Sequence, residues 1–175
     1  MDLIKGFHKI IHVLEKEDIS YMIVGGFATS YYNRYRFTAD IDFVLQVHPH
    51  HIDSIIKHFP EWKPFAEGFK ESAVRGALFN LTDFDSGVKY DFMVYQDNDY
   101  NWTAFQRRRR IEFSKIECYI ASAEDLIISK LIWYNISQSG KQKEDIEFLL
   151  TLDGLDRNYL DLWATKLFIK RHGLF

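Results

Sequence analysis

The sequence is short of cysteines, of long apolar runs and of excess charge, and each shortage excludes a class of protein. Its 175 residues include one cysteine, Cys118, which excludes an internal disulfide and a zinc site built from several cysteines. No apolar run reaches the ~20 residues of a membrane-spanning helix, and the first residues lack the charged and then apolar layout of a signal peptide. We therefore expect a soluble, intracellular protein of the cytoplasm.

The overall charge and composition describe an ordinary globular chain. The formal net charge is −3, so the surface as a whole does not indicate nucleic-acid binding. Hydrophobic residues make up 47% of the sequence and aromatic residues 17%, enough to build a substantial core. The length suits one compact domain or one domain with a helical appendage.

A glycine pair follows the first apolar run of the strand type. Residues 22–24 are apolar and end at Gly25 and Gly26, a pattern typical of a buried strand that enters a tight turn. Glycine lets the backbone approach a ligand closely, and the amides at the start of a following helix favour phosphate oxygens. The turn is therefore a candidate phosphate site, the alternative being a plain connection between strand and helix.

Two aspartates bracket Ile41 on the next expected strand. Side chains alternate along a strand, so Asp40 and Asp42 point to one face and Ile41 to the other. Two neighbouring carboxylates repel each other, and the commonest reason to keep such a pair is a divalent cation with oxygen ligands, Mg²⁺ above all. The alternative is the exposed start of a strand.

A further carboxylate lies on a strand of an expected hairpin. Residues 77–82 and 88–95 read as two strands joined by a turn. Asp91 lies on the same face of the second strand as Lys89 and Met93. A carboxylate within an apolar strand needs a partner, and the metal would supply one. The alternatives are an ion pair with Lys89 or a position at the edge of the sheet.

Apolar spacing predicts helices elsewhere, at residues 2–17, 27–33, 50–58, 100–109, 122–137, 141–151 and 156–169. The first strand is expected at residues 20–24, further short strands at 111–113 and 115–120, and a looser region around residues 60–64. Four arginines, at positions 107–110, end one predicted helix. They could hold phosphate or an RNA backbone, or they could form a solvated helix end.

The glycine pair and the two aspartates resemble a known signature. Gly25-Gly26 followed by Asp40-Ile41-Asp42 is similar to the signature of the nucleotidyltransferase superfamily that includes DNA polymerase β. The resemblance implies an α+β fold, in which a small mixed β-sheet is flanked by helices. It also implies a nucleotidyltransferase core over residues 1–120 and a helical part over residues 121–175, packed on the core as one compact unit.

A longer match narrows the resemblance. Arg36 and Thr38 extend the acidic motif to Arg-x-Thr-x-Asp-x-Asp, which resembles the minimal nucleotidyltransferases and the AbiEii-like toxins. The resemblance implies that both residues support the triphosphate or the acidic strand, the alternative being local hydrogen bonds. In the helical half, residues 124–134 and 141–146 also resemble the minimal group, which places Lys130 and Asp145 near the active site. Lys130 could instead extend its stem to water.

The resemblance assigns roles to the residues that match. It implies catalytic roles for Asp40, Asp42, Asp91 and Lys130, metal binding by Asp40, Asp42 and Asp91, and nucleotide binding by Gly25, Gly26, Arg36, Thr38, Lys130 and Asp145. The expected cofactor is Mg²⁺, with two ions and with Mn²⁺ as a substitute. The expected reaction moves a nucleoside monophosphate from a nucleoside triphosphate to a hydroxyl acceptor, which could be RNA such as tRNA, a protein or a small molecule.

The biological role stays open at this point. Some members of the resembled group are toxins with an antitoxin partner, and this chain could be one of them. The alternative is a non-catalytic nucleotide-binding or regulatory module that acts through a partner protein.

Overall fold

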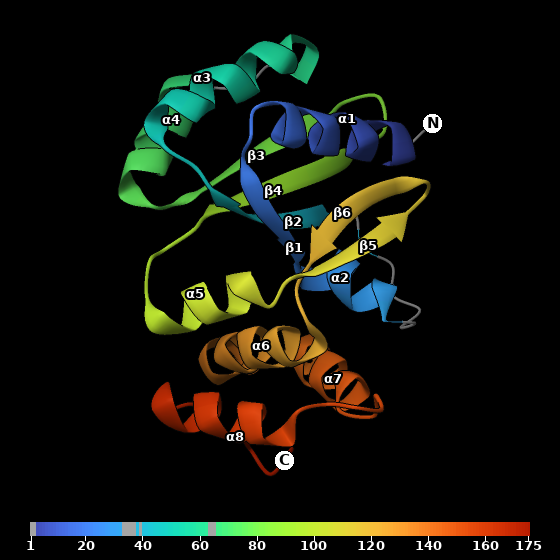
Figure 1. Cartoon of the computed structure of the whole chain (residues 1–175), viewed down its shortest axis with the longest axis vertical. Coiled ribbons are helices and arrows are strands. Elements are labelled where there is room, and N and C mark those ends of the chain that lie inside the picture. Colours follow the sequence, from blue (N-terminus) through green and yellow to red (C-terminus); the bar gives the residue numbers. More distant parts are fainter. Residues whose placement is uncertain (1–2, 33–37, 39, 63–65) are drawn as a thin grey trace.

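A six-stranded mixed β-sheet lies at the centre of the molecule (Figure 1). The computed structural model describes residues 3–32, 38, 40–62 and 66–175. The strands are β1 (Ser20–Val24), β2 (Asp40–Gln46), β3 (Leu78–Asp83), β4 (Val88–Val94), β5 (Arg109–Phe113) and β6 (Ile116–Ile120). Their order across the sheet is β3-β4-β2-β1-β6-β5. Strand β2 is antiparallel to β1 and parallel to β4, so the expected acidic strand lies in the interior of the sheet.

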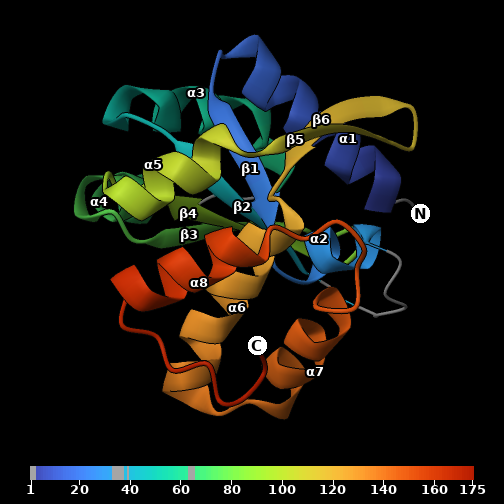
Figure 2. The same cartoon turned by 60° about the horizontal axis from the view of Figure 1, so that its bottom comes forward.

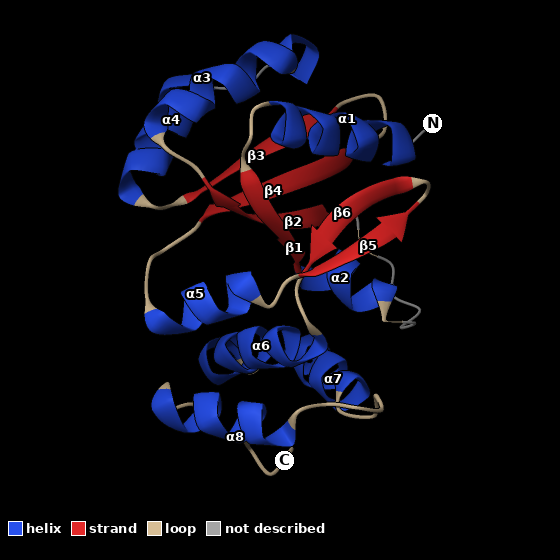
Figure 3. Ribbon diagram, viewed as in Figure 1, coloured by secondary structure: helices blue, strands red, loops and turns tan. Residues whose placement is uncertain are grey.

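Helices flank the sheet on both sides (Figure 3). One side carries α1 (Leu3–Lys16), α3 (Pro49–His58) and α4 (Ala66–Arg75), with a short 3-10 turn at Pro60–Trp62. The other side carries α5 (Asp99–Gln106) and then the carboxyl-terminal helices α6 (Ala123–Ser137), α7 (Gly140–Leu149) and α8 (Arg157–Lys166). Helix α2 (Gly25–Tyr31) begins directly at the end of β1. Among the described residues, no helix is both long and apolar enough to cross a membrane.

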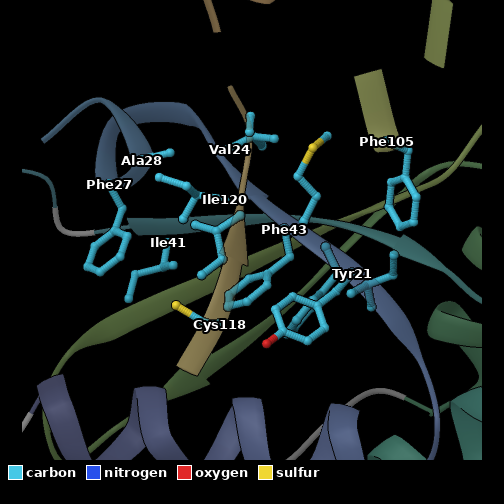
Figure 4. Packing of buried hydrophobic residues seen from close by; sticks show 14 of the residues in the cluster. Tyr21, Val24, Phe27, Ala28, Ile41, Phe43, Phe105, Cys118 and Ile120 are labelled. Carbon is cyan, nitrogen blue, oxygen red and sulfur yellow. The ribbon is translucent and has the colours of Figure 1, made fainter. Parts of the chain in front are cut away.

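The alternation of side chains along β2 separates the core from the candidate site. Ile41 and Phe43 are almost completely buried on the side of α1, whereas Asp40 and Asp42 alternate with them and are only half-buried. Figure 4 shows Tyr21, Ile41 and Phe43 directed toward one side of the sheet. Fully burying an apolar side chain of this size contributes about 1.5–3 kcal/mol. The core therefore fixes the register that places both aspartates on the opposite face.

The one cysteine belongs to the same core. Cys118 lies on β6 and is fully buried, as the sequence analysis expected for a core residue (Figure 4). Burial raises the pKa of its thiol to about 12, because an apolar environment disfavours the thiolate.

A buried carboxylate joins helix α5 to the carboxyl-terminal helices α6 and α8. Asp125, in the first turn of α6, accepts hydrogen bonds of 2.6 Å from the hydroxyls of Ser122 and Tyr159. Arg107, just after α5, donates to Asp125 over 3.4 Å and to Glu124 over 3.1 Å. Burial raises the pKa of Asp125, although the bonds from Ser122, Tyr159 and Arg107 lower it. Helices α5, α6 and α8 are thus joined at one polar point, and Figure 2 shows α6 and α8 side by side.

The arginine run has structural contacts that the sequence pattern did not suggest. Beyond the role of Arg107, the guanidinium of Arg108 donates to the Phe105 carbonyl over 2.6 Å and lies over the rings of Phe105 and Tyr119. Arg110 pairs with Glu117 across the β5–β6 hairpin. The run therefore stabilises the junction between α5 and β5 and does not form a free basic end of a helix.

Most predicted elements are confirmed, but one helix was missed and several boundaries differ by two or three residues, among them the end of α8, which lies at Lys166 rather than near residue 169. Helix α4 was missed, because Phe69 is the one buried residue among its described side chains and the sequence shows no clear apolar stripe. Helix α5 ends at Gln106 rather than near residue 109, since β5 already begins at Arg109. Helix α2 begins at Gly25, two residues before the expected start.

Candidate active site

The glycine turn after β1 lies against the aspartate of the next strand. Gly25 has φ +65°, a left-handed conformation that glycine adopts without strain. A Cβ atom at Gly25 would lie 2.0 Å from Oδ2 of Asp42, so no other residue fits there without displacing the carboxylate. The backbone amide of Gly26 hydrogen-bonds to the same carboxylate. The glycine pair therefore positions Asp42, a role that the sequence had not assigned to it.

The three predicted carboxylates lie on one face of two adjacent strands. Asp40 and Asp42 alternate with buried residues on β2, and Asp42 pairs in register with Asp91 on β4. Because β4 lies between β3 and β2, the edge-strand alternative for Asp91 is wrong. In the same register Asp40 lies opposite Lys89. The strand pairing thus brings Asp42 beside Asp91, which lies 49 positions later in the sequence, with Asp40 on the same face of the sheet.

The structure contains the ion pair between Asp91 and Lys89 that was the alternative to a metal partner. Nζ of Lys89 lies 2.7 Å from Oδ1 and 2.9 Å from Oδ2 of Asp91, and only the contact with Oδ2 has hydrogen-bond geometry. Oδ1 of Asp91 is buried and has no hydrogen-bond partner among the described residues. The side chain of Lys89 is 40% exposed, so its ammonium group can turn toward solvent. Asp91 therefore keeps one buried oxygen that a further cation could use.

The electrostatic environment of Asp42 is unfavourable to its charged form. Burial raises the pKa of Asp42, and the charges of Asp91 and Asp40 raise it further. The hydrogen bond from Gly26 and the charge of Lys130 lower the pKa of Asp42, but the net direction is upward. Carboxylates held together against their own repulsion are typical of a functional site.

Lys130 on α6 and Asp145 on α7 form a buried ion pair. Nζ of Lys130 lies 2.7 Å from Oδ2 of Asp145, and both residues are buried, at 4% and 0% exposure. The surface-lysine alternative is therefore wrong. The charge of Lys130 reaches Asp42, so the helical half of the chain contributes to the electrostatics of the carboxylate cluster.

The two remaining predicted residues precede β2. Thr38 donates a hydrogen bond of 3.1 Å to the backbone carbonyl of Asp40, a local contact of the kind expected at the start of the acidic strand. Arg36 lies outside the described residues. Across the described ranges, no three His, Cys, Asp or Glu side chains already enclose a point where a metal ion would be held.

An apolar cavity adjoins the aspartates, and the sequence analysis missed it. It has a volume of about 320 Å³ and lies between the sheet and helices α5 and α6. Met22, Val44 and Met93 are among its lining residues. The last two follow Asp42 and Asp91 by two positions on the same strand faces. This alternation could have predicted that apolar side chains continue the face that carries the aspartates. The position of the helices that cover the cavity could not be predicted from the sequence.

Solved structures with the same fold include nucleotidyltransferases. An antigenic nucleotidyltransferase-like protein from Paracoccidioides brasiliensis has a TM-score of 0.57 at 18% identity, covering 95% of this chain and 87% of its own. The lincosamide antibiotic adenylyltransferase LnuA, with lincomycin bound, has a TM-score of 0.54 at 13% identity, covering 85% of this chain and 96% of its own.

A third structure, ANT(2″)-Ia in complex with adenylyl-2″-tobramycin, has a TM-score of 0.55 at 13% identity, covering 95% of this chain and 97% of its own. At these identities the likeness establishes the fold. No curated protein sequence matches the chain. The family profile described as a nucleotidyltransferase of unknown function (DUF6036) matches residues 2–170. The chain therefore belongs to this nucleotidyltransferase family.

Proposed function

We propose that the chain is a Mg²⁺-dependent enzyme that transfers a nucleoside monophosphate from a nucleoside triphosphate to a hydroxyl acceptor. The observation that carries the proposal is the pairing of Asp42 with Asp91 across β2 and β4, with Asp40 on the same face. The glycine turn at Gly25 lies directly against this cluster. Membership of a nucleotidyltransferase family and the fold shared with two antibiotic-modifying proteins support the assignment.

The three carboxylates suit a divalent cation in their chemistry. Carboxylate oxygens are the ligands that Mg²⁺ and Mn²⁺ prefer, and Asp91 holds a buried oxygen without a hydrogen bond. A cation held by Asp42 would favour the charged form of this carboxylate, against the burial and the charges of Asp91 and Asp40 that raise its pKa. Asp40 and Asp42 would hold one ion, and Asp91 would help to hold a second after Lys89 turns away. When bound, the ions would neutralise charge on the triphosphate and on the attacking oxygen.

The residues of the chain would divide the remaining work. The turn at Gly25 and Gly26 would leave room for the phosphates, and Lys130 would act on the triphosphate as a point cation while Asp145 orients it. The acceptor oxygen would form a bond to the α-phosphorus as the bond from that phosphorus to pyrophosphate breaks. The hydroxyl proton would pass to Asp91 or to water, and pyrophosphate would leave.

The finer assignments stay predictions. They include membership of the AbiEii-like toxin group, an antitoxin partner, and a role for Arg36 and Thr38 in supporting the triphosphate. The rival proposal is a non-catalytic module that binds nucleotide and acts through a partner protein.

Nucleotide binding is the first test. With Mg²⁺ and each of the four nucleoside triphosphates in turn, at least one should raise the melting temperature, because a ligand of the folded state stabilises it by mass action. Replacing Asp40 and Asp42 together by Asn should abolish the shift and leave the protein folded. Asp53→Asn is the matched control, since Asp53 is exposed on α3 and pairs with Lys70. A wild-type protein without any shift would refute nucleotide binding.

Turnover separates the enzyme from the binding module. The pure protein is incubated with each labelled nucleotide, Mg²⁺, total tRNA and cell extract. Label that enters RNA, protein or a small molecule supports the enzyme and names the acceptor class. Nucleotide binding without transfer to any acceptor, together with copurification of a partner, would favour the module instead.

A further inference from the structure

The floor of the apolar cavity continues the strand rows that carry the aspartates. Asp42 pairs with Val24 on β1 and with Asp91 on β4, and the next row toward the cavity is Met22, Val44 and Met93. Two residues along a strand span roughly 7 Å. The cavity therefore begins one row of side chains away from the carboxylates, on the same face of the sheet.

The walls of the cavity are mostly apolar, and their one charged side chain among the described residues already has hydrogen-bond partners within the fold. Helix α5 contributes Tyr100, Ala104 and Phe105, and helix α6 contributes Leu126. Among the described residues that line it, Asp125 is the one charged side chain. Both oxygens of Asp125 already accept hydrogen bonds from hydroxyls of the fold. Phosphate groups would be desolvated here without a cation to receive them, so the cavity is unsuited to the triphosphate or to a nucleic-acid backbone.

The direction of the reaction identifies which substrate faces the cavity. In an in-line displacement the attacking oxygen and the leaving pyrophosphate lie on opposite sides of the α-phosphorus. The proposed phosphate position is the turn at Gly25 and Gly26, which lies beyond Val24 on one side of the carboxylate row. Met22 lies on the other side of that row. The attacking hydroxyl would therefore approach from the cavity.

We infer that this cavity binds the acceptor, and that the acceptor is a small hydroxyl compound whose body is an uncharged, largely apolar ring or short chain. A volume of about 320 Å³ is at the lower end of small-molecule sites. The half-buried side chain of Asn101 and the exposed side chain of Gln96 lie in the lining and supply polar groups at its border. The inference rests on the proposed function, because the position of the leaving group comes from it.

The methionines provide a direct test. The sequence contains three methionines, and two of them, Met22 and Met93, line the cavity. Protein labelled with ¹³C at the methionine methyl groups gives three signals, which Met22→Leu and Met93→Leu assign. Benzyl alcohol serves as the probe of an apolar ring with a hydroxyl. Titration with benzyl alcohol should shift the Met22 and Met93 signals saturably, and adenosine should neither shift them nor displace the alcohol.

A matched pair of variants on α6 tests the location. Ser129 lines the cavity, so Ser129→Leu should fill it and weaken benzyl alcohol binding about tenfold or more. Ser137→Leu makes the same change at an exposed position of the same helix and should leave the affinity unchanged. Both variants should keep the melting shift caused by nucleotide and Mg²⁺.

Each contrary result has its own meaning. No shift of the Met22 and Met93 signals, or equal affinity in the Ser129→Leu variant, would overturn the inference while a nucleotide-induced melting shift left the proposed function standing. Adenosine that competes for the cavity would overturn it by making the cavity a base site. Binding of the alcohol without any nucleotide-induced shift would overturn both the proposed function and the acceptor assignment.

Discussion

The buried pair of Lys130 and Asp145 allows a sharp separation of stability from function. The two side chains are 5% and 0% exposed, and their charged atoms lie 2.7 Å apart. Removing one partner of a buried pair typically costs about 3–5 kcal/mol, because the other charge stays desolvated. For a domain of this size, Lys130→Met should therefore lower the melting temperature by roughly 6–20 °C.

The double variant should behave differently from the sum of the single ones. Replacing both partners by apolar residues, as in Lys130→Met with Asp145→Leu, is often nearly neutral. We expect it to recover most of the stability that either single change removes, which a double-mutant cycle of unfolding free energies measures. Lys143→Met is the control, because Lys143 and Glu147 form an exposed pair on α7 worth about 0.5 kcal/mol or less.

Nucleotide affinity then reports the proposed role of Lys130. The recovered double variant should bind a nucleoside triphosphate more weakly than the wild type, with a smaller loss for the monophosphate, since the lysine would act on the terminal phosphates. Unchanged triphosphate affinity in a stable double variant would remove Lys130 from the site. Losses that simply add in the double variant would show that the two charges are not coupled, against the geometry.

Three further changes test other parts of the structure. Gly25→Ala should weaken Mg²⁺-nucleotide binding, measured by calorimetry, because its φ costs about 1–2 kcal/mol for alanine and the Cβ would displace Asp42; unaltered affinity would contradict the contact. Asp91→Asn should leave nucleotide affinity nearly intact and abolish transfer; equal loss of both would mean that its role is misassigned. Tyr159→Phe should cost about 1.5–3 kcal/mol in denaturant unfolding, because Asp125 loses a buried donor; a change below 0.5 kcal/mol would refute this.

The strands and the carboxylates were predictable from the sequence because local patterns determine them. Alternation around Ile41 placed Asp40 and Asp42 on one face, and the glycine pair marked the end of β1, which spans the predicted residues 20–24. The hairpin that carries Asp91 was also visible from its turn. These features depend on neighbours in the chain, and strand periodicity reports them directly.

The contacts across long distances in the chain were not predictable in the same way. The pairing of Asp42 with Asp91 follows from the parallel register of β2 and β4, which no single segment encodes. The cavity depends on how α5 and α6 cover the sheet. The run that begins at Arg107 looked like a basic surface, but Arg107 binds buried acidic partners on α6 and therefore has a structural role. Each of these features depends on contacts between segments that are far apart in the sequence.

The rate at which the buried thiol of Cys118 is labelled reports how often the core around it opens. The side chain of Cys118 is fully buried and burial raises its pKa to about 12, so at pH 8 the native thiol is much less reactive than the thiol of an unfolded chain, of which about a quarter is ionised. Alkylation by iodoacetamide would therefore proceed through opened molecules, and the chain has one position where it can occur. A ligand that binds the closed form slows such labelling by the factor one plus its concentration over its Kd. Mass spectrometry of this single alkylation site, with one candidate nucleotide or acceptor added at a time, could then rank the candidates without purified product or a known reaction.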